Sequence, residues 1–217
     1  MIATGMTTTV ERVTAGALAL VAWGALVLQY GLLLQAAGPL GLSVGEATVR
    51  FFSYFTIHAN VLAALMLTAL ALRTKANEWT VHPFERSAVA TYIAVVMLVY
   101  LGVLQSLWAP RGAQWLADML LHYALPLAYL AVWLWVMRKA GLRWYDPLLW
   151  LIYPAFYLAF VLVRGRWSGF YPYPFLDVGR LGYGQVALNV LALIAVFVVA
   201  GFAILLASRL LARREPV

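Results

Sequence analysis

The chain alternates between long apolar runs and short polar connections. Six runs reach or approach the roughly 20 apolar residues that a helix needs to cross about 30 Å of hydrocarbon. They lie at residues 13–36, 52–72, 88–107, 115–136, 147–163 and 185–207. This pattern predicts an all-α, polytopic membrane protein: a single integral domain over residues 1–217, folded as a six-transmembrane-helix bundle.

The composition supports the same conclusion. Hydrophobic residues make up 65% of the chain and charged residues 11%, against about 45–50% and about 25% in soluble domains. The net charge of +7 does not indicate a nucleic-acid partner, because the basic residues lie in the connections, where they orient helices in the bilayer. The absence of cysteine excludes disulfides and thiol chemistry.

Lysine and arginine are distributed unevenly between the connections. At the termini and in the second and fourth connections lie ten of the 15: Arg12, Arg73, Lys75, Arg86, Arg138, Lys139, Arg143, Arg209, Arg213 and Arg214. In the other connections lie Arg50, Arg111, Arg164, Arg166 and Arg180. Because basic residues favour the cytoplasmic side, both termini are predicted to be cytoplasmic.

Polar residues gather at the outer end of the second run, in FFSYFTIHAN. Ser53, Thr56 and Asn60 have the spacing i, i+3, i+7, which predicts one polar helix face in the outer leaflet. His58 is two residues from both Thr56 and Asn60, so it is expected to point away from that face. Polar groups at this depth are costly in lipid, and a functional site is the first hypothesis for them.

The fourth run, WLADMLLHYALPL, contributes an acid and a base from the same side of the membrane. Asp118 and His122 are four residues apart, so they share a helix face, and packing gives no reason for either residue. His122 and Thr56 are expected to meet between helices. Pro126 removes the helical hydrogen bond to the carbonyl of His122, which predicts a kink beside the histidine.

Further polar residues lie at the outer ends of other runs. Gln105 ends the third run, Arg164 follows the fifth and Asn189 begins the sixth. Residues 164–184 are rich in aromatics, glycine and proline, which predicts an irregular outer cap with Trp167, Tyr171 and Tyr173 at headgroup depth. The candidate substrate-binding residues are therefore Ser53, Asn60, Gln105, Arg164, Tyr173 and Asn189.

Four motifs, FFSYFTIHAN, DMLLHYALPL, WLIYPAFYLAFVLVRG and GFYPYPFLDV, occur in this order. Together they resemble a bacterial branch of six-span membrane proteins related to the eukaryotic androgen-induced and androgen-dependent membrane proteins. The resemblance covers about residues 13–189. The spacing from Thr56 to Asn60 is one residue longer than in the eukaryotic pattern, and that from His122 to Pro126 one residue shorter.

The resemblance implies a membrane-embedded threonine hydrolase that cleaves fatty acyl esters of hydroxy fatty acids or similar lipids. Thr56 would be the nucleophile and His122 the base. The resemblance does not include Asp118, whose position one helical turn from His122 suits it to orient the imidazole, with a water or a different orienter as the alternative. Ser53, Asn60, Gln105 and Asn189 remain open as donors to the oxyanion. The first span and the aromatic cap are expected to hold the acyl tail. No cofactor or metal is expected, and the location would be the bacterial plasma membrane.

Two other classes of function remain as alternatives. A non-catalytic membrane protein could bind a lipid or small ligand in the same pocket, with Arg50, Arg164 and Arg166 suited to an anionic headgroup. A haem or metal protein could use His58 and His122, but no third ligand converges with them. The partner in either main reading is a membrane lipid or an acyl ester, and the oligomeric state is left open.

Overall fold

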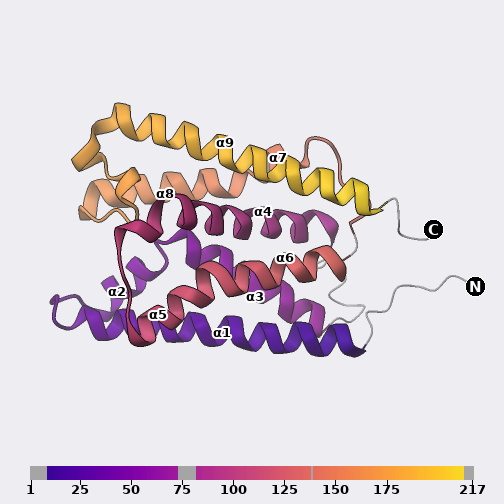
Figure 1. The fold of residues 1–217 in the computed structure, drawn as a ribbon. Helices are drawn as coiled ribbons and strands as arrows, with labels where there is room; N and C mark the ends of the chain where they lie inside the picture. The colour runs from indigo at the N-terminus through magenta and orange to yellow at the C-terminus, as the bar shows by residue number, and fades with distance from the viewer. Residues whose placement is uncertain (1–8, 73–81, 138, 213–217) are drawn as a thin grey trace, which may run out of the picture.

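The computed structural model describes residues 9–72, 82–137 and 139–212, which form a bundle of helices without a strand (Figure 1). The first helix and the last long helix lie at opposite edges of the bundle, and the start of the first lies at the same end as the end of the last (Figure 1). The α-helices are α1 (Thr9–Ala37), α2 (Val44–Phe51), α3 (Phe55–Ala71), α4 (Pro83–Val99), α5 (Gly112–Met119), α6 (Leu125–Trp135), α7 (Asp146–Leu149), α8 (Ile152–Ser168) and α9 (Val178–Ala212). The shorter helical segments are the π-helices η2 (Tyr100–Leu104) and η4 (Leu120–Ala124) and the 3₁₀ helices η3 (Gln105–Leu107) and η5 (Pro174–Leu176).

Five helical stretches of the described chain are long and apolar enough to cross a membrane. They are Thr9–Ala37, Pro83–Leu107, Gly112–Trp135, Asp146–Ser168 and Val178–Ala212. Only 22% of the most apolar window of the last stretch is buried, so its apolar side chains face outward, as lipid-facing side chains do. The all-helical, multi-pass membrane class predicted from the sequence is confirmed, with helix ends that differ from the predicted ones by several residues.

The second apolar run is not the single helix that the sequence predicts. It contains α3 but begins at the end of α2, and the axes of α2 and α3 are bent by 74° across residues 52–54. Ser43 is the N-cap of α2, because its Oγ accepts a hydrogen bond from the amide of Glu46. At the break, the Oγ of Ser53 donates back to the carbonyl of Val49 at 2.6 Å, which satisfies a carbonyl that the ending helix leaves free.

The outer connection is also more regular than predicted. Helix α8 continues through Arg164 to Ser168 and ends at Gly169, whose positive φ of 69° is typical of a glycine helix cap. The irregular part is confined to residues 169–177, and Gly182 interrupts α9 near its start. Trp167 is 84% exposed, as expected for headgroup depth, but Tyr173 is 8% exposed and points into the bundle.

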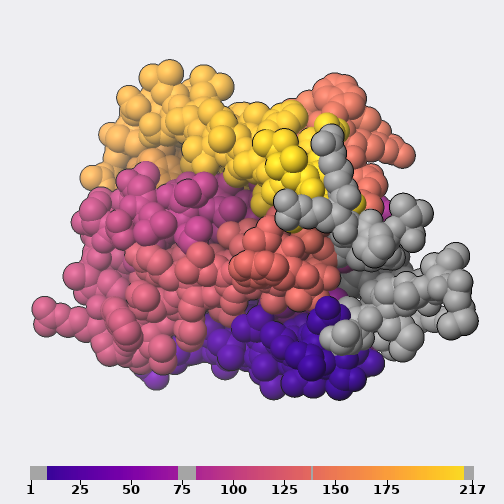
Figure 2. Space-filling model, turned by 45° about the vertical axis from the view of Figure 1, so that its right-hand side comes forward, coloured from indigo at the N-terminus to yellow at the C-terminus, as the bar shows by residue number. Residues whose placement is uncertain are grey.

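Small residues allow α1 to pack closely along α3. Ala15, Ala19 and Ala22 are buried at helical spacing on α1, and Ala59 and Ala63 are buried on α3. Close approach through small side chains is how membrane helices gain packing energy without a hydrophobic driving force. On the face shown in Figure 2, the segment from η2 to α6 lies between α1 and α9, so the helices that carry the candidate site sit within the bundle.

Five of the ten basic residues assigned to the cytoplasmic side lie outside the described part of the chain. They are Arg73, Lys75, Arg138, Arg213 and Arg214.

One glycine allows the outer connection to fold back on α8. The ring of Tyr171 lies against Gly165 at a distance that leaves no room for a Cβ atom. We expect Gly165→Ala to displace the Tyr171 ring and to lower the free energy of unfolding by about 1–3 kcal/mol. Thermal unfolding in detergent measures this change. The control variant is Gly24→Ala, because Gly24 is a helical glycine with open space around it. Equal stability of the two variants would contradict this packing.

Candidate active site

The structure brings Thr56, His122 and Asp118 together. The Oγ1 of Thr56 lies 3.3 Å from Nε2 of His122. The other ring nitrogen of His122, Nδ1, lies 3.2 Å from Oδ1 of Asp118. The i, i+4 spacing therefore permits a direct contact between the imidazole and the carboxylate. A hydroxyl, an imidazole and a carboxylate in this order form the arrangement of a nucleophile, a base and an orienting acid.

The hydrogen-bond partners of His122 determine which ring nitrogen carries the proton. Nδ1 faces the backbone carbonyl of Asp118 at 3.1 Å as well as its carboxylate, and both partners can only accept. The proton of the neutral ring is therefore assigned to Nδ1, and Nε2 is left to accept from Thr56. This is the tautomer in which a histidine can take a proton from a hydroxyl.

Tyr100 completes the group, and no spacing in the sequence indicates it. Its hydroxyl donates to Oδ2 of Asp118, and its ring stacks on the ring of His122 with centroids 4.0 Å apart. Asp118 is 4% exposed and Tyr100 is 4% exposed. The carboxylate thus has a hydrogen-bond donor at Oδ2 and the His122 ring close to Oδ1, which offsets part of the cost of its burial.

Both helices that supply this group change to π geometry at the site. Tyr100 begins η2, and His122 lies in the middle of η4. A π-helical turn inserts one residue into an α-helix, is rare, and is frequent at functional sites. Two such turns side by side allow the rings of Tyr100 and His122 to face each other.

The π-helical turn changes which carbonyl Pro126 leaves free. In η4 the amide of Leu125 bonds to the carbonyl of Leu120, five residues back. In that register the carbonyl opposite Pro126 belongs to Leu121, and proline has no N–H to offer it. The prediction that His122 would lose its carbonyl partner is therefore wrong by one residue.

Asn60 supplies the missing donor. Its Nδ2 donates to the carbonyl of Leu121 at 3.1 Å and to the carbonyl of Thr56 at 2.9 Å. The side chain is 1% exposed. Asn60 therefore joins α3 to η4 and fixes the distance between the residues that carry the hydroxyl and the imidazole.

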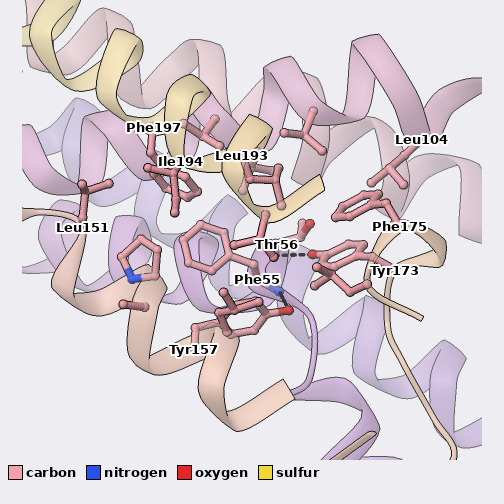
Figure 3. A pocket seen from close by; sticks show the side chains of 18 residues that line it. Phe55, Thr56, Leu104, Leu151, Tyr157, Tyr173, Phe175, Leu193, Ile194 and Phe197 are labelled. Carbon is pink, nitrogen blue, oxygen red and sulfur yellow. Dashed lines mark hydrogen bonds between the residues drawn. The ribbon is translucent and has the colours of Figure 1, made fainter. Parts of the chain in front are cut away.

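Thr56 lies in the first turn of α3, directly after the break. The amides of a first helical turn have no partner within the helix, and Tyr54 at the N-cap position contributes no side-chain bond. Two tyrosine hydroxyls replace it: that of Tyr157 accepts from the amide of Phe55 at 3.1 Å, and that of Tyr173 accepts from the amide of Thr56 at 3.3 Å (Figure 3). Tyr173, predicted to be a substrate-binding residue, lies at the site, but it is buried and not at headgroup depth.

A cavity of about 190 Å³ is lined by Thr56 but not by His122. Its walls come from α3, α4, η2, α8, η5 and α9, and Figure 3 shows apolar side chains around Thr56 and Tyr173. Ala155 of α8 and Ile194 of α9 line it and are exposed, so the cavity reaches the surface between these two helices. The first span does not contribute to its walls, contrary to the prediction, although the cap does.

The remaining predicted substrate residues do not meet at Thr56. Gln105 is exposed and accepts from the hydroxyl of Tyr123 at 2.9 Å, and Asn189 donates to the carbonyl of Phe175 at 2.9 Å. Ser53 is buried at the break, where its hydroxyl is used by the backbone, so it does not share a helix face with Thr56.

The basic residues near the outer end of α8 are also engaged. Arg164 and Arg50 both bind Glu46, at 2.9 Å and 3.0 Å, and both lie over the ring of Phe170. These contacts tie α2 to α8. Because each guanidinium already has a carboxylate partner, this pair is not an open site for an anionic headgroup.

His58 does not join the Thr56 site, as its position in the sequence predicts. Its Nε2 donates to the carbonyl of Phe52 at 2.7 Å, so Nδ1 accepts from the hydroxyl of Tyr153 at 2.9 Å. Within the described residues, no group of three or more His, Asp or Glu side chains lies close enough to hold a metal ion. Comparison of the chain with family models, curated proteins and solved structures finds no match.

Asn60 provides a test of this geometry that does not depend on activity. We expect Asn60→Leu, which keeps the volume of the side chain, to lower the free energy of unfolding by about 1–3 kcal/mol, because two buried carbonyls lose a donor. Thermal unfolding in detergent measures the loss. The control is Thr91→Val, since the buried hydroxyl of Thr91 bonds only within its own helix, to the carbonyl of Ser87. A loss no greater than that of the control would contradict the role of Asn60.

Proposed function

We propose that this protein is an intramembrane hydrolase of lipid esters that uses Thr56 as its nucleophile and His122 as its base. One observation carries the proposal: Thr56, at the wall of an apolar cavity, is hydrogen-bonded to His122, whose other ring nitrogen lies 3.2 Å from the carboxylate of Asp118. This arrangement supplies an activated hydroxyl, and the cavity suits an acyl chain. The resemblance to the androgen-induced and androgen-dependent threonine hydrolases is in agreement with it.

The first half of the reaction transfers the acyl group to the protein. Oγ1 of Thr56 attacks the ester carbonyl while Nε2 of His122 takes its proton, because a free hydroxyl is a weak nucleophile. The imidazolium that forms is stabilised by the carboxylate of Asp118. When the tetrahedral intermediate collapses, the proton on Nε2 passes to the leaving alkoxide, and an alcohol departs from an acyl-threonine.

The second half releases the acid. Water gives a proton to Nε2 of His122 and its oxygen attacks the carbonyl of the acyl-threonine. The second intermediate collapses to a fatty acid, and the proton returns from Nε2 to Oγ1 of Thr56. The net reaction consumes one ester and one water and produces one acid and one alcohol.

The position of the cavity supports a lipid substrate. Its walls are apolar apart from the hydroxyls of Thr56, Tyr157 and Tyr173. Its opening between Ala155 and Ile194 lies within two helices that are candidate membrane spans, so an acyl chain would reach it from the bilayer. The ester group would then stop at Thr56.

The same proposal includes six spans and two cytoplasmic termini. Six spans require α2 and α3 to count as one broken span, and broken helices are tolerated at membrane depth where they line a cavity. The distribution of basic residues supports cytoplasmic termini, and the family resemblance supports the bacterial plasma membrane as the location.

A fluorophosphonate probe tests the nucleophile without knowledge of the natural substrate. We expect the purified protein to take up one probe per chain on Thr56, and Thr56→Ala and His122→Ala to lose labelling by about a thousandfold or more in rate. Intact mass and the labelled peptide measure this. Thr68→Ala, which alters another threonine of α3, is the matched control and should label as the wild type does.

Labelling that survives in Thr56→Ala would place the nucleophile elsewhere. A folded wild-type protein that takes up no probe and cleaves no lipid ester would favour the alternative of a non-catalytic lipid-binding protein.

The opening of the cavity gives an independent test of the substrate class. We expect Ala155→Trp to block the opening and raise the KM for a long-chain p-nitrophenyl ester by about tenfold, equivalent to about 1.4 kcal/mol of lost binding. Ala159→Trp is the control, because Ala159 is exposed on the same helix one turn further and does not line the cavity. Equal KM values for the two variants would argue against access between α8 and α9.

A further inference from the structure

We propose that the hydroxyl of Tyr173 and the backbone N–H of Thr56 form the oxyanion hole of this site. The inference rests on the proposed function and names the groups that stabilise its tetrahedral intermediates. The attack of Oγ1 of Thr56 turns the carbonyl oxygen of the ester into an oxyanion, which needs donors fixed in place before the reaction.

The side-chain amides that the sequence suggests for this role are engaged elsewhere. Both amide hydrogens of Asn60 are used by the carbonyls of Thr56 and Leu121. Gln105 donates to the carbonyl of Leu101, and Asn189 to that of Phe175. The hydroxyl of Ser53 is bound to the carbonyl of Val49.

The Thr56 amide is well placed for the role. It belongs to the same residue as the nucleophile, and an oxygen attached to a carbon on Oγ1 comes within reach of that residue's own N–H. The amide also lies in the first turn of a 17-residue helix. The N-terminus of a helix carries roughly half a positive charge, which favours a developing anion.

Tyr173 adds a second donor at the same place. Its hydroxyl lies 3.3 Å from the Thr56 amide, where it acts as the acceptor. In the bond to the amide the phenolic proton is not used, so it remains available to donate. Tyr173 is buried and lines the cavity (Figure 3). In the structure the N–H of Thr56 donates to the hydroxyl of Tyr173, so in the proposal the ester oxygen takes the place of this acceptor and receives hydrogen bonds from both groups.

Tyr157 is the natural comparison, because it caps the preceding amide of the same helix. Its hydroxyl accepts from the amide of Phe55 at 3.1 Å and donates to the carbonyl of Ser53 at 2.7 Å. Its proton is therefore committed to the backbone. The two tyrosines share the capping role, and only Tyr173 is next to the nucleophile.

Hydrolysis of p-nitrophenyl decanoate by purified protein in detergent separates the two roles. We expect Tyr173→Phe to lower kcat by about a hundredfold, as loss of one oxyanion donor does, with KM changed by less than about threefold. Tyr157→Phe should lower the melting temperature at least as much but lower kcat far less. Tyr92→Phe, which removes a buried hydroxyl that donates to the carbonyl of Trp150, should leave kcat unchanged.

Equal losses of kcat in Tyr173→Phe and Tyr157→Phe would overturn the oxyanion hole in favour of helix capping, and so would a wild-type kcat in Tyr173→Phe. Thr56→Ala in the same assay keeps this result distinct from a failure of the proposed function. If Thr56→Ala retains wild-type activity, the hydrolase mechanism itself is wrong. If it is inactive while Tyr173→Phe is fully active, only the oxyanion hole is wrong.

A second measurement serves if Tyr173→Phe does not fold. Incorporation of 3-fluorotyrosine at position 173 keeps the hydroxyl and makes it more acidic. A phenolate cannot donate to an oxyanion, so the alkaline limb of the kcat profile should move to lower pH than in the wild type. An unmoved alkaline limb would overturn the proposal. A Tyr173 oxygen that only accepts a hydrogen bond from the Thr56 amide can keep that role after ionisation, so kcat would then not depend on its proton.

Discussion

A backbone group without a hydrogen-bond partner is the constraint on which this structure depends. At membrane depth no water replaces a missing partner, so each interruption of a helix must be repaired by protein groups. The break before α3 leaves two amides without a partner in the helix, and they donate to the hydroxyls of Tyr157 and Tyr173. The proline after η4 frees the carbonyl of Leu121, which Asn60 binds. The groups that make these repairs are the ones that surround Thr56 and His122, so the site is assembled by the same bonds that keep the broken helices stable.

The hydropathy pattern was sufficient to predict the class of fold, because membrane spans are defined by length and apolar content. It could not predict the break at residues 52–54. Phe52 and Tyr54 are as apolar as a helix interior requires, and a 74° bend leaves the mean hydropathy of the run unchanged. The length of the irregular cap was overestimated for a related reason. Glycine and aromatic residues suggested a loop from residue 164 onward, but Gly165 lies inside α8, where the ring of Tyr171 packs against it.

The site was predictable where polar residues stand out against an apolar background. Thr56, His122 and Asp118 have no packing role in lipid, and the helical spacing of the last two placed them on one face. Tyr100 could not be found in this way, because tyrosine is common at membrane interfaces and its hydroxyl gives no periodic signal. Tyr173 was predicted as a substrate-binding residue, but its hydrogen bond to the Thr56 amide could not be read from the sequence. The carbonyl that Pro126 leaves free belongs to Leu121 and not to His122, because the π-helical turn η4 shifts the hydrogen-bond register by one residue. No spacing in the sequence reveals this turn.

The direction of the hydrogen bonds argues that the group is organised around the carboxylate. Tyr100 donates to Oδ2 of Asp118, while Nδ1 of His122 is hydrogen-bonded to the backbone carbonyl of Asp118 and lies 3.2 Å from Oδ1. With its Nδ1 proton held there, His122 has only Nε2 to offer, and Nε2 faces the hydroxyl of Thr56. A proton can therefore pass from Thr56 toward His122, and Thr56 also borders the apolar cavity at the N-terminal end of α3. A base beside the hydroxyl and an apolar cavity at the same residue are the two features on which the proposed hydrolase rests.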